Sequence, residues 1–556
     1  MANLSKTRTL FAFTSPRTIE KIVPEIGLLT AKYSGVKWNQ ETQTSFFQDL
    51  SSTDFYEGQR PTKNQDFAAR DRINRAPKAL GFVDLSPTIQ LTDAGQSLLS
   101  GKRIHERIAK QLLKFQFPSP YHPLSEAEFF VRPYLELLRL TNDLGGLSKT
   151  EIALFFTQVT HIAKYDKVVA AIRSFREASK RKTTSRSIYV EECFEKAIAR
   201  IYSAEIAAGE FATRESDEVT YRKFVRTKRT NMKDYADAFF RYLRATTLIT
   251  VERRTFRMII SPSKRDEVEF ILAHTPREPV AFADAKEFKE YLFSATNMPL
   301  LVDDETLLLA KLSRLGKASR RGEMRLEQLK DLLERTEGKL LAQRKEQVSA
   351  ELKNFKEYDD IVAVFDQIKK KEVPDPALFL EWNVWRAIVM LNYAVRTEGN
   401  FVMDLDGMPV NTAPGKVPDI EVDYKDFGMI VEVTMSSGQR QYEMEGEPVA
   451  RHFGRAREVK KNMYCLFIAP SISEGTLAHY FNLNRINTKH YGGKTRIIPL
   501  SVAQFLDFIA IAREHKFSDP SKVERWLNGA CAFNQECEDE MVWKEHIATS
   551  MKTWAA

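Results

Sequence analysis

The sequence has little cysteine and lacks several motifs that would assign a common chemistry. Its four cysteines, Cys193, Cys465, Cys531 and Cys537, show neither CxxC pairing nor zinc-site spacing, so we expect reduced thiols. No glycine-rich phosphate loop, GxSxG elbow or HExxH motif occurs. These absences disfavour nucleotide hydrolases, serine esterases and zinc proteases. No apolar run has transmembrane length, and the first residues have no apolar segment suited to a signal peptide. We therefore expect a cytoplasmic protein without a membrane partner.

Length and charge point to several domains with different tasks. A chain of 556 residues is too long for one core, and 43% hydrophobic with 28% charged residues is ordinary globular composition. Residues 1–250 hold 39 Lys and Arg against 28 Asp and Glu, or +11, whereas residues 251–556 hold 44 against 47, or −3. A solvated surface explains part of this surplus. The division is also typical of a separate polyanion-binding N-terminal half.

An acidic pair stands out in residues 417–434, which the pattern predicts to be a β-hairpin. Glu432 lies between Val431 and Val433 in an apolar strand, where an ionised carboxylate is costly without a compensating cation or proton. Asp419 begins the preceding strand, and the hairpin can bring it beside Glu432. Two carboxylates without a Lys or Arg to neutralise them suit a hard cation such as Mg²⁺. The alternative is a pair of ordinary carboxylates at a strand edge.

Further acidic residues flank this hairpin. Residues 376–395 predict a buried helix that carries Glu381, either turned toward an apolar layer or serving as a partner for Arg386. After the hairpin, Glu443, Glu445 and Glu447 are clustered where the pattern predicts a helix that begins at Pro448. His452 would lie one turn inside that helix. We expect these side chains to gather near the acidic pair.

The order of an acidic helix, a PD strand start, an EVT strand and an acidic, His-bearing helix resembles the PD-(D/E)xK nuclease core. The fragments EWNVWRAI, VPDIEV, VEVT and YEMEGEPVARHF resemble the cleavage domain of the AlwI-type family of type IIS restriction endonucleases, which includes strand-specific nicking enzymes. The resemblance implies Mg²⁺ as the cofactor and a site in which Asp419 and Glu432 bind metal. It also implies that Glu381 assists them and that Glu445 and His452 complete the catalytic set.

The chain departs from the nuclease pattern at Thr434, where a lysine usually stands. A threonine supplies no cation for the phosphate. A second metal ion, His452, or a more distant lysine such as Lys460 or Lys461 would have to take that role, and the sequence does not choose among them.

The N-terminal half contains two segments in which helices precede a short hairpin, with strands expected at 81–85 and 88–91 and at 247–251 and 256–260. This order is typical of winged-helix DNA-binding modules, so residues 1–118 and 119–275 are predicted to be two recognition subdomains. A basic loop is expected at 180–186. Surface charge is the alternative interpretation of each basic residue. The predicted DNA contacts are Arg70, Arg72, Arg75, Lys78, Lys180, Arg181, Lys182, Arg222, Lys223, Arg226, Lys228 and Arg229.

The predicted fold is therefore multidomain α+β. Residues 276–372 are expected to form a helical linker, and residues 373–556 an α/β cleavage domain with a mixed sheet. We expect a Mg²⁺-dependent endonuclease that binds a short asymmetric duplex sequence and cuts at a fixed distance outside it. The alternatives are a nicking enzyme, as the large subunit of a heterodimer, and an inactive winged-helix DNA-binding regulator. The expected partners are double-stranded DNA and, for cutting the second strand, a transient homodimer or a small cleavage subunit.

Overall fold

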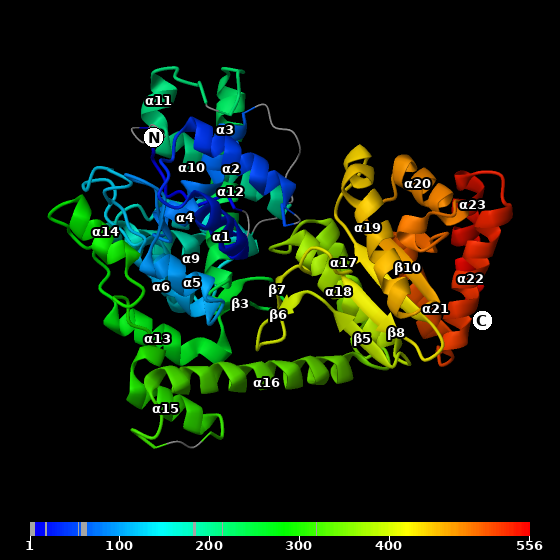
Figure 1. Ribbon diagram of the computed structural model, residues 1–556. Coiled ribbons are helices and arrows are strands. Elements are labelled where there is room, and N and C mark those ends of the chain that lie inside the picture. The colour runs from blue at the N-terminus through cyan, green and yellow to red at the C-terminus, as the bar shows by residue number, and fades with distance from the viewer. Residues whose placement is uncertain are drawn as a thin grey trace. The chain divides into compact units, whose positions relative to one another are not determined.

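The computed structural model describes residues 6–16, 19–53, 55–56, 64–181, 185–213, 215–317 and 320–555. It divides the chain into two compact units, Met1–Thr336 and Glu337–Ala556 (Figure 1). The boundary lies within helix α16 (Leu326–Leu352). Among the helices described, none combines the length and the apolar character needed to cross a membrane.

The N-terminal unit is mostly helical, and polar side chains cap several of its helices. Ser148 caps α8 in a capping box with Glu151. The helices are α1 (Ile22–Tyr33), α2 (Gln40–Ser52), α3 (Gln65–Ile73), α4 (Ala76–Ala79), α5 (Asp93–Leu99), α6 (Ile104–Lys114), α7 (Pro133–Asp143), α8 (Lys149–Leu154), α9 (Tyr165–Arg181), α10 (Arg186–Ile201), α11 (Ser203–Ala207), α12 (Tyr221–Arg244), α13 (Arg265–His274), α14 (Ala285–Phe293) and α15 (Glu305–Arg314), with 3₁₀ turns η1 (Ile19–Lys21), η2 (Phe156–Gln158), η3 (Ile162–Lys164), η4 (Pro262–Lys264) and η5 (Leu301–Asp303).

Both expected hairpins of this unit are present. Strand β1 (Val83–Asp84) pairs antiparallel with β2 (Gln90–Leu91), and β3 (Ile249–Val251) pairs antiparallel with β4 (Met258–Ile260). The winged-helix assignment of the two subdomains stays a prediction.

One local expectation for the basic segments is wrong. Lys180 and Arg181 belong to the last turn of α9 rather than to a loop, while Lys182 lies outside the described residues. The basic residues that follow Tyr221 lie on one long helix, α12, because Thr220 caps its first turn and nothing breaks the chain before Arg244.

Part of the predicted linker packs within the N-terminal unit. Lys289 forms an ion pair with Asp84 at 2.7 Å, and the side-chain amide of Gln111 donates to the carbonyl of Leu292 at 2.8 Å. The side chain of Arg103 reaches Asp331 at 2.9 Å. Residues 276–336 are thus anchored to the helices before them. The division of the chain into four parts stays a prediction.

The C-terminal unit is built on a five-stranded sheet with the order β11-β10-β9-β8-β5. Strands β9, β10 and β11 run parallel, whereas β8 is antiparallel to β9 and β5 is antiparallel to β8, which confirms the mixed sheet. The strands are β5 (Arg396–Gly399), β8 (Ile420–Asp423), β9 (Gly428–Val433), β10 (Met463–Ala469) and β11 (Ile497–Ser501), with a separate hairpin of β6 (Val402–Met403) and β7 (Pro409–Asn411).

Helices cover this sheet (Figure 1). One cluster of buried side chains joins β9 and β10 to the helices α19 and α20. Ile430, Phe453, Phe467 and Tyr480 belong to that cluster, together with the free thiol of Cys465. The helices are α17 (Tyr358–Lys369), α18 (Pro376–Leu391), α19 (Gln439–Val459), α20 (Glu474–Arg485), α21 (Val502–Glu514), α22 (Pro520–Glu536) and α23 (Glu540–Ser550), with 3₁₀ turns η6 (Lys489–Tyr491) and η7 (Met551–Thr553).

Two helix boundaries near the acidic residues differ from expectation. Helix α18 ends at Leu391 rather than at residue 395, because Asn392 and Tyr393 have φ values of 62° and 64° in the left-handed region. Helix α19 begins at Gln439, directly after Gly438 with φ 60°, and Pro448 lies inside it. Glu445 and His452 are therefore on one helix, seven residues or about two turns apart, and share a face.

Candidate active site

The register of the hairpin places Asp419 opposite Glu432. Ile420 pairs with Val431, so the residue before β8 faces the residue after Val431 on β9. The backbone N–H of Val433 donates to Oδ2 of Asp419 at 2.7 Å and fixes this carboxylate against the end of β9. Glu432 is buried, with 6% of its surface exposed. The expected acidic pair is thus brought together.

Glu381 approaches the same pair from α18. Its side chain is buried, and the carboxyl group of Asp419 adds to the burial that raises its pKa. Its Oε2 accepts from the backbone N–H of Ala413 at 3.3 Å. Arg386 does not pair with Glu381, because its guanidinium binds Asp360 and lies 3.6 Å from Glu357.

Helix α19 adds two functional groups. The hydroxyl of Thr434 donates to Oε1 of Glu445 at 2.6 Å. Nδ1 of His452 lies 2.8 Å from Oε1 of Glu432. The other ring nitrogen, Nε2, is buried and has no hydrogen-bond partner among the residues described. All five residues predicted to be catalytic therefore lie in one connected group.

Burial and mutual repulsion shift the pKa values of these groups in the direction that favours their neutral forms. Burial raises the pKa of Glu432 well above its ordinary value, and the charges of Asp419 and Glu445 raise it further. Burial is also the main cause that raises the pKa of Glu381 well above its ordinary value, with Asp419 adding to it. The pKa of Asp419 rises to about 6, chiefly through burial. Burial lowers the pKa of His452 to about 4, so the imidazole is neutral at physiological pH.

The donor chemistry of these four carboxyl groups fits a hard divalent cation. In the described part of the chain, no Lys or Arg forms an ion pair with Glu381, Asp419, Glu432 or Glu445, so their charge is left for a proton or a metal ion to balance. Across the same residues, no three Asp, Glu, His or Cys side chains are arranged to hold a metal ion as they stand. Coordination would require ionised carboxyl groups and rotation of the side chains.

The cation missing at Thr434 is not supplied by Lys460. Its ammonium group binds Asp423 and donates to the carbonyl of Tyr424 at 2.6 Å, at the turn between β8 and β9. Glu432 is four residues along β9 from that end, or about 13 Å away. Arg451 was not predicted to affect the site. Its positive charge partly offsets the rise in the pKa of Glu432 and adds to the fall in the pKa of His452, both of which burial causes in the main. Its position directly before His452 is its one signal in the sequence.

The predicted DNA contacts fall into two classes. In the first class, the cationic groups already have partners within the N-terminal unit. Arg72 binds the buried carboxylate of Glu25, Arg70 pairs with Asp66, Arg75 with Asp71, Lys180 with Glu177, and Arg229 with Glu191. Lys78 lies over the ring of Tyr121, and Lys228 over the rings of Tyr202 and Phe224.

The second class consists of Arg222, Lys223 and Arg226 on the first turns of α12, together with Arg181 at the end of α9. Arg181, Arg222 and Arg226 are exposed and Lys223 is partly exposed. Within the described ranges, none of these four side chains forms an ion pair. Their charges are free to meet phosphate.

Comparison with known proteins gives weak structural matches and one family. One solved structure, the small subunit (R.BspD6I2) of the heterodimeric restriction endonuclease R.BspD6I, shares 24% identity at a TM-score of 0.30, covering 34% of this chain and 97% of that one. The BpuJ1 endonuclease binding domain, in complex with modified DNA, shares 13% identity at a TM-score of 0.34, covering 52% and 96%. At these scores neither similarity assigns a function. No curated protein matches the chain. The family model of the AlwI restriction endonuclease matches residues 78–508, more than half of the sequence, and the chain belongs to this family of nucleases.

Proposed function

We propose that the protein is a Mg²⁺-dependent, site-specific DNA endonuclease of type IIS with a PD-(D/E)xK-like nuclease core. The observation that carries this proposal is the buried group of four carboxyl groups with raised pKa values and no ion pair to a Lys or Arg in the described residues. Membership of a restriction endonuclease family supports phosphodiester hydrolysis as the reaction in which these carboxyl groups take part. Perturbed titratable groups of this kind cluster at functional sites.

Each member of the group has a defined task in this proposal. Asp419 and Glu432 hold the metal ion, and Glu381 assists them. Mg²⁺, when bound, supplies Lewis-acid stabilisation of the phosphate and lowers the pKa of water. The backbone N–H of Val433 orients Asp419, and the hydroxyl of Thr434 orients Glu445.

His452 is suited to accept a proton in the same reaction. Its imidazole is neutral, and the contact between Nδ1 and Glu432 fixes the orientation of the ring. If Nδ1 carries the ring proton, the unpartnered Nε2 offers a lone pair to an attacking water.

DNA binding is assigned to the N-terminal unit. Its basic surplus and the exposed cations of α12 suit contact with phosphates, and the two hairpins support winged-helix recognition. Because recognition and hydrolysis then lie in different units, cutting outside the recognised sequence follows. The second candidate is a strand-specific nicking enzyme that cuts both strands only with a small cleavage subunit. Only one such cluster of four carboxyl groups is found in the described residues, which favours this candidate because one cluster can act on one strand at a time.

The test compares alanine variants of two aspartates at opposite ends of β8, Asp419 and Asp423. Asp419→Ala should reduce plasmid cleavage in Mg²⁺ by at least about 10³-fold, because removal of a metal ligand removes transition-state stabilisation. Asp423→Ala is the matched control. Asp423 ends β8, and its side chain is 52% exposed and pairs with Lys460 away from the group. Both variants should retain sequence-specific binding in a gel-shift assay. Normal cleavage by Asp419→Ala contradicts the assigned site, and wild-type protein that binds DNA without cutting favours the inactive regulator.

A further inference from the structure

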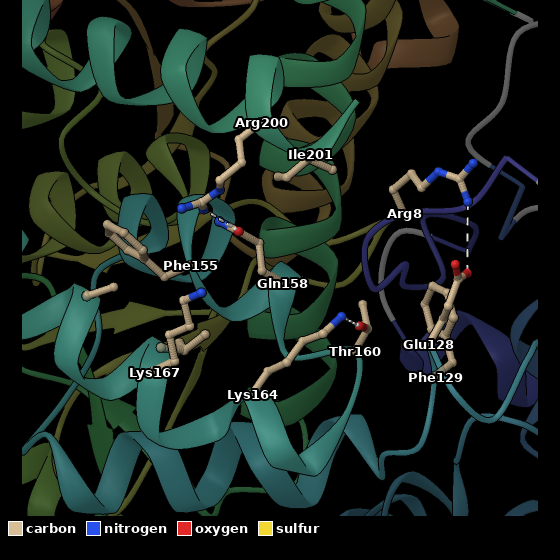
Figure 2. A pocket seen from close by; sticks show the side chains of 12 residues that line it. Arg8, Glu128, Phe129, Phe155, Gln158, Thr160, Lys164, Lys167, Arg200 and Ile201 are labelled. Atoms are coloured by element: carbon tan, nitrogen blue, oxygen red, sulfur yellow. Dashed lines mark hydrogen bonds and ion pairs between the residues drawn. The ribbon is translucent and has the colours of Figure 1, made fainter. Parts of the chain in front are cut away.

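A cavity of about 370 Å³ lies in the N-terminal unit, lined by residues of α9, α10 and the segments beside η2 and η3 (Figure 2). Its volume falls within the range of about 300–1,000 Å³ that is typical of small-molecule sites. It is larger than an inorganic phosphate requires. None of its lining residues belongs to the carboxylate group of the candidate active site.

Three cations that line this cavity, Lys164, Lys167 and Arg200, have no carboxylate partner among the described residues. The ammonium group of Lys164 donates to the hydroxyl of Thr160 at 2.6 Å, and the guanidinium of Arg200 donates to Oε1 of Gln158 at 2.8 Å. Lys167 is exposed and forms no ion pair within the described ranges. Hydroxyl and amide partners position the first two cations without neutralising them. The three charges together favour an anion.

The remaining charges at the cavity nearly cancel each other. Arg8 pairs with Glu205 at 3.0 Å and lies 3.9 Å from Glu128. Burial lowers the pKa of Lys164, while Glu128 raises it. The surplus of positive charge therefore resides on Lys164, Lys167 and Arg200.

The other part of the lining is apolar and aromatic. Phe129 is buried, and the half-buried ring of Phe155 is held by an edge contact with Phe175 at 5.3 Å between centroids. Val168 and Ile201 extend this surface. Figure 2 shows the side chains of Phe155, Lys164, Lys167 and Arg200 around one space. A ligand that fits both the aromatic and the cationic part of the lining carries a flat ring and a phosphate.

We propose that this cavity binds a phosphate-bearing nucleotide, with the base against the phenylalanines and the phosphate between Lys164, Lys167 and Arg200. Aromatic faces accept any base by stacking, and cations hold the phosphate by charge-assisted hydrogen bonds. The nucleotide is either free or an unpaired unit of the DNA. Only the second source rests on the proposed DNA binding.

The test uses the full-length protein and isothermal titration with dAMP and with inorganic phosphate. We expect dAMP to bind at one site and more tightly than phosphate, which leaves the apolar part of the cavity unfilled. Lys167→Glu and Arg200→Glu should each weaken dAMP at least about tenfold, the loss of one charge-assisted contact. Arg173→Glu on α9 and Lys196→Glu on α10 are the controls, since both replace exposed cations outside the cavity lining. The controls should bind dAMP as the wild type does.

Competition then separates the two sources. Displacement of dAMP by a 5′-phosphorylated oligodeoxythymidine, but not by duplex DNA, indicates an unpaired nucleotide of DNA, whereas no displacement by either indicates a free nucleotide. Absence of dAMP binding, or equal losses in the cavity and control variants, overturns the proposal. Plasmid cleavage in Mg²⁺ is measured on the same preparations. Retained cleavage without dAMP binding rejects the cavity alone, and dAMP binding without cleavage rejects the proposed function alone.

Discussion

The pKa values of Glu381 and Asp419 are raised chiefly because both side chains are buried, and two more carboxyl groups lie near them. Their raised pKa values mean that the folded state binds more protons than the unfolded chain near neutral pH. The resulting stability is fully present below the unfolded pKa values of about 4 and is lost as the pH rises through the folded values, which for Asp419 is about 6. A bound cation would favour the ionised carboxylates instead.

This competition between proton and cation predicts that Mg²⁺ stabilises the protein more at high pH. Millimolar MgCl₂ should raise the melting temperature more at about pH 8 than at about pH 5.5, because the metal ion binds the ionised carboxylates and their pKa values are raised. Differential scanning fluorimetry with and without MgCl₂ measures the shift. Glu432→Gln removes a ligand and should abolish most of the pH dependence. An equal shift at both pH values in the wild type would contradict metal binding by these carboxyl groups.

Arg72 shows how a basic residue that was predicted to contact DNA acts within the fold. It binds Glu25, whose side chain is only 3% exposed and whose pKa is raised mainly by burial. Arg72→Met should therefore lower the free energy of unfolding by about 2–3 kcal/mol, since it leaves a buried carboxyl group without its partner. Arg70→Met is the control, because Arg70 is 46% exposed and pairs with Asp66 at the surface. Urea unfolding measures both. Equal, small effects would show that the Glu25 contact contributes little.

At the scale of elements, periodicity predicted the parts whose signals are local. The hairpin at Asp419 and Glu432 has the expected strands, and both expected hairpins of the N-terminal unit are present. The start of α19 was wrong because proline favours the first turn of a helix, while the real break is the backbone of Gly438. The partners of Arg72 and Lys460 could not be predicted. They come from residues 47 and 37 positions away, which only the fold brings near.

Helix α12 carries the basic residues whose replacement should weaken DNA binding to a similar extent for every sequence. Replacing Arg222, Lys223 and Arg226 by alanine should weaken binding of any duplex and reduce the slope of log affinity against log salt by up to about 2.7, or about 0.9 for each phosphate contact. Fluorescence anisotropy across a salt series measures the slope. Lys286→Ala on α14 is the control, because this 85% exposed side chain lies outside the predicted contacts. An unchanged slope would remove α12 from the DNA surface.

At the scale of the whole molecule, charge and chemistry are divided between the two units. The +11 surplus of residues 1–250 lies in the N-terminal unit, while the carboxylate group lies in the C-terminal unit. Residues 401–450 contain ten acidic and three basic residues, so the charge of the protein alone repels phosphate there. In the proposed function, DNA is held by the first unit and cut in the second, where a cation would offset this repulsion.

One group of Glu381, Asp419, Glu432 and Glu445 can address one phosphodiester at a time, and the strands of a duplex run past it in opposite directions. We therefore expect a monomer to nick. Cutting of the second strand requires another cleavage unit, from a second copy related by a two-fold axis or from a small subunit. Nicked and linear plasmid are followed by gel electrophoresis against enzyme concentration. Nicked circles should appear first, and the rate of linear product per enzyme should rise with concentration or on addition of a partner subunit. Linear product formed without a nicked intermediate, at a rate per enzyme independent of concentration, would show that one chain cuts both strands.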